Sequence, residues 1–201
     1  MPSASDSAMS LIFKSILEGF TMRFDGGIKS LVKGACDASV ELYNRISAEL
    51  LPTPSKFHYT FNLRDLSKVF QGILMVTAKT CNNPETFTKL WIHESMRVFY
   101  DRLATTQDQS WFTHAVVELI NRHFKQPWTH DDLFEEVFKS SDGQDDNEAA
   151  DEDDHKSAPD PIIFVDYLRP GGDVRPYEIA KDFSKLGTLL DDYLDEYNVV
   201  R

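Results

Sequence analysis

Cysteine is scarce in this chain, whose 201 residues include only Cys36 and Cys81. Two widely separated cysteines are too few for a disulfide framework or a zinc site. The chain also lacks an apolar run of about 20 residues, the length that a membrane-spanning helix needs. Its N-terminal residues lack the basic and apolar regions of a signal peptide. The sequence therefore predicts an intracellular protein with no metal site and no membrane contact.

Positive charge is also scarce, with 21 lysines and arginines against 33 aspartates and glutamates. A net charge of -12 disfavours binding to nucleic acids and to anionic membranes. Residues 142–160 hold nine carboxylates and one lysine, which is -8 of this total. Because they include no aromatic or branched aliphatic residue to bury, we expect residues 141–160 to be a mobile acidic loop. An EF-hand loop starting at Asp142 is excluded, since Asn147 stands where glycine is required.

Sequence signatures of catalysis are missing as well. The chain has no GxxxxGK[ST] loop to hold nucleotide phosphates, and no apolar strand that ends in paired acidic residues to hold magnesium. His93 and Glu94 begin like a zinc protease motif, but Arg97 stands where the second histidine would be. The chain also lacks a recognisable local signature of a Ser/His/Asp or Cys/His arrangement. The sequence therefore predicts no catalytic residue within this chain, and no ATP hydrolysis by the chain alone.

What the chain does have is apolar residues at helical spacing. Hydrophobic residues make up 41% of it, enough for a modest core. Apolar positions recur every three to four residues, as in helices with one buried face, over residues 10–20, 28–50, 63–76, 84–103 and 109–124, after Thr129 and after Asp182. Short β-prone runs lie at 162–164 and 177–179. The sequence thus predicts a mainly α fold, a bundle of about six to seven helices with a short β-hairpin near the C-terminus.

These elements divide the chain into four predicted segments. Residues 1–9 would be disordered or left over from expression, 10–140 would form the helical domain, 141–160 the acidic loop, and 161–201 the hairpin and last helix. Within the helical domain, we expect the helix over 84–103 to be the longest and best buried. Its Glu94, Arg97 and Asp101 are spaced for a solvated ladder of ion pairs.

The most informative segment is 50–74, where two prolines precede a strong helix start. Pro52 and Pro54 end the preceding helix, because proline supplies no backbone N–H and restricts the residue before it. Asn62 has the side chain of a helix N-cap, and Asp65 stands three residues later to complete a capping box. The sequence therefore predicts that a helix begins directly after Asn62, with Leu66 on its buried face.

Arg64 occupies an unusual place in this helix, the second position of its first turn. A cation there is unfavourable by about 0.3–1 kcal/mol, because the N-terminus of a helix carries partial positive charge. Two interpretations remain open. Arg64 could pair with Asp65, Asp101 or another carboxylate, or it could complete an anion site together with unpaired backbone N–H groups. Lys68, one turn later, could face the same ligand.

Three segments of the chain also resemble a known family. TPSKFHYTFNLRDLSKVFQGIL (53–74), LWIHESMRVFYDRL (90–103) and YEIAKDFSKLGTLLDDYLDEYN (177–198) resemble, in the same order, segments of axonemal dynein heavy chains. The resemblance is to the small helical lid subdomain of the third AAA+ module of the motor ring, running into the start of the fourth. It implies an AAA+ lid-like fold.

The resemblance also implies functional roles. Arg64 would be the sensor-II residue, which reaches the phosphates of nucleotide on the neighbouring large subdomain, possibly joined by Lys68. The intact motor would use ATP or ADP with magnesium. Its partners would be the neighbouring AAA+ subdomains of the same heavy chain, the microtubule, and dynein intermediate and light chains. Its location would be the cytoplasm and the ciliary or flagellar axoneme, within the cytoskeleton.

A different class of function also fits the residues. A free-standing helical interaction module could recruit a basic partner through the acidic loop at 141–160. The two hypotheses differ in what they expect of the parent reading frame, since only the motor hypothesis expects it to continue upstream into a phosphate loop and downstream into another.

Overall fold

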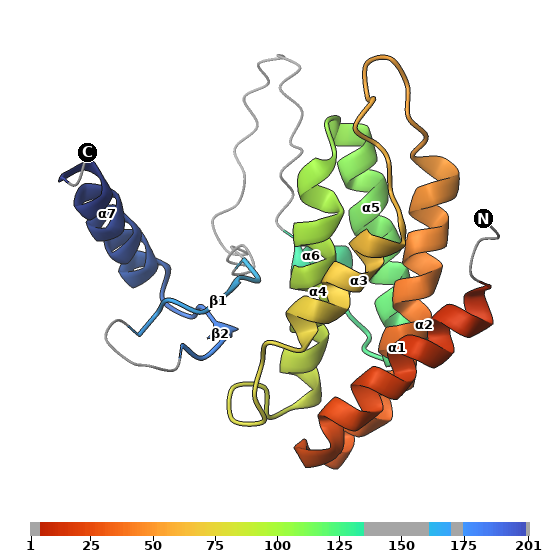
Figure 1. Cartoon of the computed structure of the whole chain (residues 1–201), viewed down its shortest axis with the longest axis horizontal. Coiled ribbons are helices and arrows are strands. Elements are labelled where there is room, and N and C mark those ends of the chain that lie inside the picture. Colours follow the sequence, from red (N-terminus) through yellow and green to blue (C-terminus); the bar gives the residue numbers. More distant parts are fainter. Residues whose placement is uncertain (1–4, 135–160, 170–174, 200–201) are drawn as a thin grey trace, which may run out of the picture.

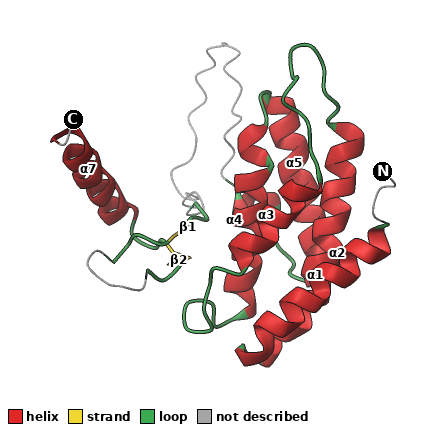
Figure 2. Ribbon diagram, viewed as in Figure 1, coloured by secondary structure: helices red, strands yellow, loops and turns green. Residues whose placement is uncertain are grey.

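The computed structural model describes residues 5–134, 161–169 and 175–199, which form seven α-helices and one small antiparallel sheet (Figure 1, Figure 2). The predicted mainly α fold is confirmed. Residues 1–4 and the predicted acidic loop at 141–160 lie outside the described residues. The helices are α1 (Asp6–Phe20), α2 (Gly26–Glu49), α3 (Leu63–Ile73), α4 (Pro84–Val98), α5 (Thr106–Leu119), α6 (His130–Leu133) and α7 (Phe183–Val199).

The first helix begins earlier than predicted. We expected disorder over residues 1–9 and a helix from Ser10, but α1 begins at Asp6. Ser5 caps it, because its Oγ accepts a hydrogen bond from the Ala8 N–H at 3.3 Å. Met9 in the first turns is buried. The cap at Ser5 and the buried side chain of Met9 thus stabilise a first turn that the spacing of apolar residues did not predict.

The longest described helix is α2, with 24 residues, and not α4, which has 15. Asp25 caps α2 by accepting a hydrogen bond from the Gly27 N–H at 2.8 Å. The predicted helix over 84–103 is shorter because α4 ends at Val98 and the chain tightens into a 3₁₀ turn, η2 (Tyr100–Arg102). The cap predicted for α3, Asn62, is confirmed, and Asn83 caps α4 by accepting a hydrogen bond from the Thr86 N–H at 2.7 Å.

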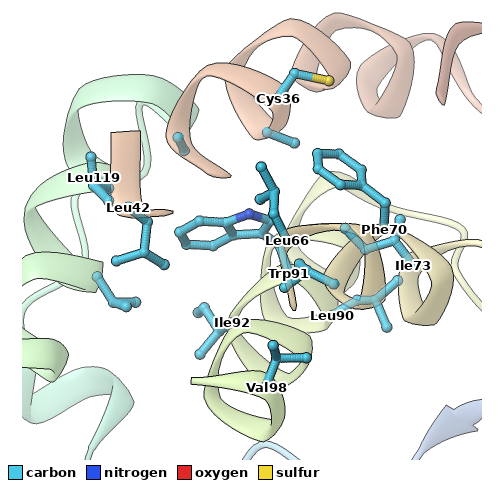
Figure 3. Packing of buried hydrophobic residues seen from close by; sticks show 14 of the residues in the cluster. Cys36, Leu42, Leu66, Phe70, Ile73, Leu90, Trp91, Ile92, Val98 and Leu119 are labelled. Carbon is cyan, nitrogen blue, oxygen red and sulfur yellow. The ribbon is translucent and has the colours of Figure 1, made fainter. Parts of the chain in front are cut away.

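The core is centred on Trp91 of α4, which is fully buried. Figure 3 shows its indole between Leu42 of α2 and Leu66 of α3. The indole Nε1 donates a hydrogen bond to Ser39 Oγ of α2 at 2.8 Å, so this buried polar group is satisfied. The helix α3 packs along α4, and both rest on α2 (Figure 1). This arrangement places the start of α3 at the surface of a well-packed bundle.

The predicted regular helix over 109–124 is wrong at its C-terminal end. The chain forms α5 and then a π-helical turn, η3 (Ile120–Phe124), which ends at Lys125 in the left-handed region at φ 55°. The backbone of this turn approaches α2 so closely at Gly34 that a Cβ there would overlap the His123 carbonyl. A glycine on another helix therefore makes room for the wider turn.

The predicted hairpin is confirmed as β1 (Phe164–Val165) and β2 (Glu178–Ile179), with Phe164 paired to Ile179. Phe164 belongs to the main core cluster, whereas Val165 packs with Leu186 of α7 in a small second cluster. Beyond Leu186 most of α7 is exposed. Figure 1 shows α7 standing away from the bundle, with the hairpin between them.

Both cysteines are buried as free thiols, Cys36 in α2 and Cys81 before α4. Burial raises the pKa of each thiol to about 12, because a low-dielectric surrounding disfavours the thiolate. The two residues are therefore unreactive packing side chains at neutral pH.

Candidate functional site

The loop between α2 and α3 is fixed to the start of α5 by a partly buried carboxylate, that of Asp108. Lys56 Nζ lies 2.5 Å from Asp108 Oδ2, and the Tyr59 hydroxyl donates to the same oxygen at 2.7 Å. The Tyr59 hydroxyl also accepts from the Ala104 N–H at 2.8 Å. Burial alone would raise the pKa of Asp108, but hydrogen bonds from Lys56, Thr105 and Tyr59 lower it below its usual range. Asp108 is thus ionised at neutral pH and holds the loop.

Arg102, in the turn after α4, fixes the last residues before α3. Its Nη2 donates to the backbone carbonyls of His58 at 2.8 Å and Thr60 at 3.3 Å. Its Nη1 lies 3.2 Å from Asp65 Oδ2, and its guanidinium covers the ring of Phe61 at 4.7 Å from the centroid. One arginine therefore joins the loop, the start of α3 and the end of α4.

The start of α3 has the predicted capping box. Asn62 Oδ1 accepts from the Arg64 N–H at 2.8 Å, and Asp65 Oδ2 accepts from the Asn62 N–H at 3.1 Å. Burial alone would raise the pKa of Asp65, but the Asn62 N–H and the cations of Lys68 and Arg102 lower it. The first turn of α3 is therefore held by an ionised, almost fully buried carboxylate.

Arg64 projects from this fixed turn as an exposed side chain. Within residues 5–134, 161–169 and 175–199, its guanidinium has no carboxylate partner within ion-pair distance. The adjacent Asp65 is paired instead with Lys68 at 3.2 Å and with Arg102 at 3.2 Å. The interpretation that Arg64 pairs with Asp65 or Asp101 is therefore not supported by the described residues.

A shallow polar concavity of about 350 Å³ lies beside the start of α3. Lys68 lines this concavity and Arg64 does not, although the two residues are one turn apart. The common ligand for Arg64 and Lys68 remains a prediction. Each cation of the concavity already has a carboxylate partner, Asp65 or Glu94. The lining residues are Thr60, Asn62, Asp65, Lys68, Arg97, Val98 and Arg102.

Glu94 of α4 is a residue whose place the sequence reasoning missed. The sequence predicts a solvated ladder with Arg97 and Asp101, but Glu94 has 0% exposure, and among the described residues it forms an ion pair with Arg97 alone, at 2.7 Å. The Tyr177 hydroxyl, from the hairpin, donates to the other carboxylate oxygen at 2.5 Å. A sequence signal was present, because Glu94 lies three residues after Trp91 and four before Val98, on the buried face of α4.

Other chemistry finds no support in the described part of the chain. It contains no group of three or more histidine, cysteine, aspartate or glutamate side chains placed to hold a metal ion. Nor does any described helix combine the length and the apolar character required to cross a membrane.

Comparisons with known proteins agree with the helical fold and with the segment order. A model of the AAA+ lid domain family matches residues 35–139, slightly more than half of the chain. The chain is 37% identical over 201 residues to dynein axonemal heavy chain 6 of Homo sapiens, an alignment that covers 99% of this chain and 4% of that protein.

Two further relatives have the same kind of name. The chain is 36% identical to dynein axonemal heavy chain 1 of Mus musculus over 86% of its length, and 35% identical to dynein axonemal heavy chain 12 of Rattus norvegicus over 98%. It spans only 4% and 6% of these two proteins.

Proposed function

Because the chain belongs to the AAA+ lid domain family, in the form carried by axonemal dynein heavy chains, we propose that it closes over nucleotide bound by a neighbouring large AAA+ subdomain. In this role it is the lid of the third module of a motor ring and runs into the start of the fourth. Its direct partners are the adjacent AAA+ subdomains of the same heavy chain. Through that motor it acts on microtubules in the axoneme, with dynein intermediate and light chains.

The observation that carries this proposal is the exposed guanidinium of Arg64, which pairs with no carboxylate among the residues that the structure describes. Elsewhere around α3 the cations are neutralised, since Lys68 and Arg102 share Asp65. Arg64 stands at a helix N-terminus, where a cation is disfavoured unless an anion offsets it. A phosphate group is such an anion, and a guanidinium binds it with short, charge-assisted hydrogen bonds. Arg64 thus has the position of a phosphate sensor, and its N–H donors are available for a phosphate group.

The surroundings of Arg64 fit a sensor that moves as part of a rigid body. Asp108 fixes the loop before α3, and Arg102 fixes the turn itself. The backbone that carries Arg64 therefore cannot shift without moving α4 and α5. Contact between Arg64 and a phosphate would consequently tilt the whole bundle, which is how a change of nucleotide becomes a change of lid orientation.

The chain supplies only part of a nucleotide site. It has no phosphate loop, and its described residues offer no cluster of carboxylates for magnesium. The phosphate loop and the magnesium ligands of ATP or ADP therefore belong to the neighbouring subdomain in this proposal. The residues of this chain bind and orient the phosphates from the side opposite the neighbouring subdomain.

The test uses a heavy-chain segment that contains the preceding large subdomain together with this lid. Arg64→Ala should weaken ATP or ADP binding by about tenfold or more, because one charge-assisted hydrogen bond is worth about 1.5–3 kcal/mol. The measurement is the Kd of a fluorescent nucleotide. Arg64→Lys should recover only part of the affinity.

Arg23→Ala provides the matched control, since Arg23 is another exposed arginine, in the 3₁₀ turn η1 (Thr21–Arg23) that follows α1. It should leave the Kd unchanged within twofold. Unchanged affinity in Arg64→Ala would contradict the lid proposal and favour the alternative of an interaction module.

A further inference from the structure

Glu94 joins three parts of the molecule, and the lid proposal gives it no role. Its carboxylate belongs to α4, faces Gly72 of α3 on one side and meets the Tyr177 hydroxyl of the hairpin on another. We propose that Glu94 is a positioning residue, a joint that transmits movement of α3 and α4 to the hairpin and through it to α7. The part that concerns nucleotide rests on the proposed function, whereas the joint itself can be tested without it.

The fit against α3 is close. A Cβ at Gly72 would overlap the carboxylate of Glu94, and Gly72 lies inside α3. Glycine within a helix costs about 0.5–1 kcal/mol relative to alanine, so the helix gives up stability to admit this group. Because no side chain intervenes, any displacement of the α3 backbone at Gly72 acts directly on the Glu94 carboxylate.

Both carboxylate oxygens are occupied. Arg97 donates to Oε2 from Nε at 3.0 Å and from Nη2 at 2.7 Å, while the Tyr177 hydroxyl takes Oε1. Burial and the neighbouring carboxylate raise the pKa of Tyr177, so its hydroxyl stays protonated and can donate at any physiological pH. A buried carboxylate adds little stability over an apolar residue, but its hydrogen bonds have a direction. This favours a role in orientation over a role in stability.

His93, the residue before Glu94 in α4, contacts the other arm of the hairpin, the one that contains β1. Its Nδ1–H donates to the Ile162 carbonyl at 3.1 Å, and its ring lies against Phe164 and Tyr177. Burial lowers the pKa of His93, so this ring is neutral at pH 7. Two successive residues of α4 thus each bind one arm of the hairpin, and the hairpin cannot rotate on α4 without breaking one of these bonds.

The hairpin also connects the helical bundle to α7 along the chain. Tyr177 directly precedes β2, and the chain continues from β2 into α7. Since α7 packs through Leu186 in one cluster with Val165 of β1 and Ala180, its direction depends on the hairpin. A shift of Glu94 is therefore passed to α7, which leads onward along the heavy chain.

The joint can first be tested in this chain alone. Tyr177→Phe keeps the ring and removes the hydroxyl, so the hairpin should open more often. Hydrogen exchange of the Ala180 amide, which donates to Ile163 O, should become about tenfold faster, because one hydrogen bond to a charged group is worth about 1.5–3 kcal/mol. Amides of α3 and α4 should exchange as before, within twofold.

Tyr167→Phe is the matched control, because Tyr167 lies in the same segment and contacts Tyr193 of α7, not Glu94. It should leave the exchange of Ala180 unchanged. Equal exchange rates of the Ala180 amide in wild type and Tyr177→Phe would overturn the joint. Faster exchange throughout α3 and α4 would also overturn it, because the hydrogen bond would then stabilise the whole fold and not the hairpin alone.

The transmission is tested in a segment that also includes the preceding large subdomain and the following module. One dye is placed on α5 and another on α7, and their distance is measured with and without nucleotide. Tyr177→Phe should bind nucleotide with unchanged Kd, within twofold, yet lose at least half of the nucleotide-dependent change in distance. A full change in distance would overturn transmission through Glu94. If Arg64→Ala binds nucleotide normally, the sensor proposal fails, while the exchange experiment still decides the joint.

Discussion

Arg64 and Arg102 lie at the same helix start and differ in almost every contact. Arg102 binds two backbone carbonyls and Asp65 and covers an aromatic ring, whereas Arg64 extends into solvent. Within a few residues, the molecule thus separates the arginine that holds the structure from the arginine that is available to a ligand. Stability measurements can distinguish the two roles.

The first prediction compares these two arginines. Arg102→Ala should lower the free energy of unfolding by about 1.5–3 kcal/mol, because it removes hydrogen bonds to a charged group. Arg64→Ala should change it by less than about 0.5 kcal/mol, as expected for an exposed side chain. Urea denaturation followed by circular dichroism measures both. A larger loss in Arg64→Ala than in Arg102→Ala would reverse the two roles.

The second prediction concerns the glycine beneath Glu94. Gly72→Ala should destabilise the protein by about 1–3 kcal/mol, because the new methyl group displaces the buried carboxylate. The control is Gly19→Ala in α1, where a Cβ would meet no atom within 4 Å. That variant should gain about 0.5–1 kcal/mol from helix propensity. Thermal unfolding of the two variants should therefore shift in opposite directions, and a shared upward shift would place Glu94 elsewhere.

At the scale of an element, α3 owes its stability to one buried face. Leu66→Ala should cost about 2–5 kcal/mol, since Leu66 is fully buried beside Trp91 and a cavity would remain. Leu63, in the same helix, is 40% exposed, so Leu63→Ala should cost less than about 1 kcal/mol. Chemical denaturation gives both values. Equal costs would show that α3 is rotated from its described orientation.

The sequence predicted those features that depend on nearby residues. Asn62 and Asp65 bind backbone N–H groups within three residues of themselves, so the capping box of α3 could be predicted from a short window of sequence. The buried stripe of α3 likewise follows from its apolar spacing. For the same reason, the sequence placed Arg64 in the first turn of α3, while its role as a phosphate sensor stays a prediction.

Features that depend on distant residues could not be predicted. The buried partner of Glu94 is Tyr177, 83 positions away, and the π-helical turn needs space at Gly34 of another helix. The spacing of Glu94 from Trp91 indicates the buried face of α4, but it does not indicate which group neutralises the carboxylate there. Nothing near Glu94 in the sequence indicates that a hairpin will cover it.

At the scale of the whole molecule, ionised carboxylates tie separate elements together. Glu41 of α2 binds His123 and Arg45, Asp65 binds Arg102, and in each case these bonds outweigh burial and lower the carboxylate pKa. A lowered folded-state pKa contributes stability above the unfolded value of about 4, and this is lost as pH falls through the folded value.

The fourth prediction follows from that sign. The melting temperature should be nearly constant for these carboxylates above about pH 5 and should fall steeply as pH decreases below about 4. Asp65→Asn should be less stable at pH 7 and should show a shallower loss between pH 5 and 3. Differential scanning calorimetry across this range makes the comparison. A parallel pH dependence in wild type and variant would mean that Asp65 titrates alike in the folded and unfolded states.

The two buried cysteines have a practical consequence for experiments that test the proposed motion of the lid. A maleimide dye reacts with a thiolate, and thiols with a pKa of about 12 that are closed off from solvent offer almost none at pH 7. A cysteine introduced on the surface of α5 or α7 would therefore be the reactive one in the native chain. Dye pairs can be attached without first replacing Cys36 and Cys81, so the packing that they fill stays intact while the movement is recorded.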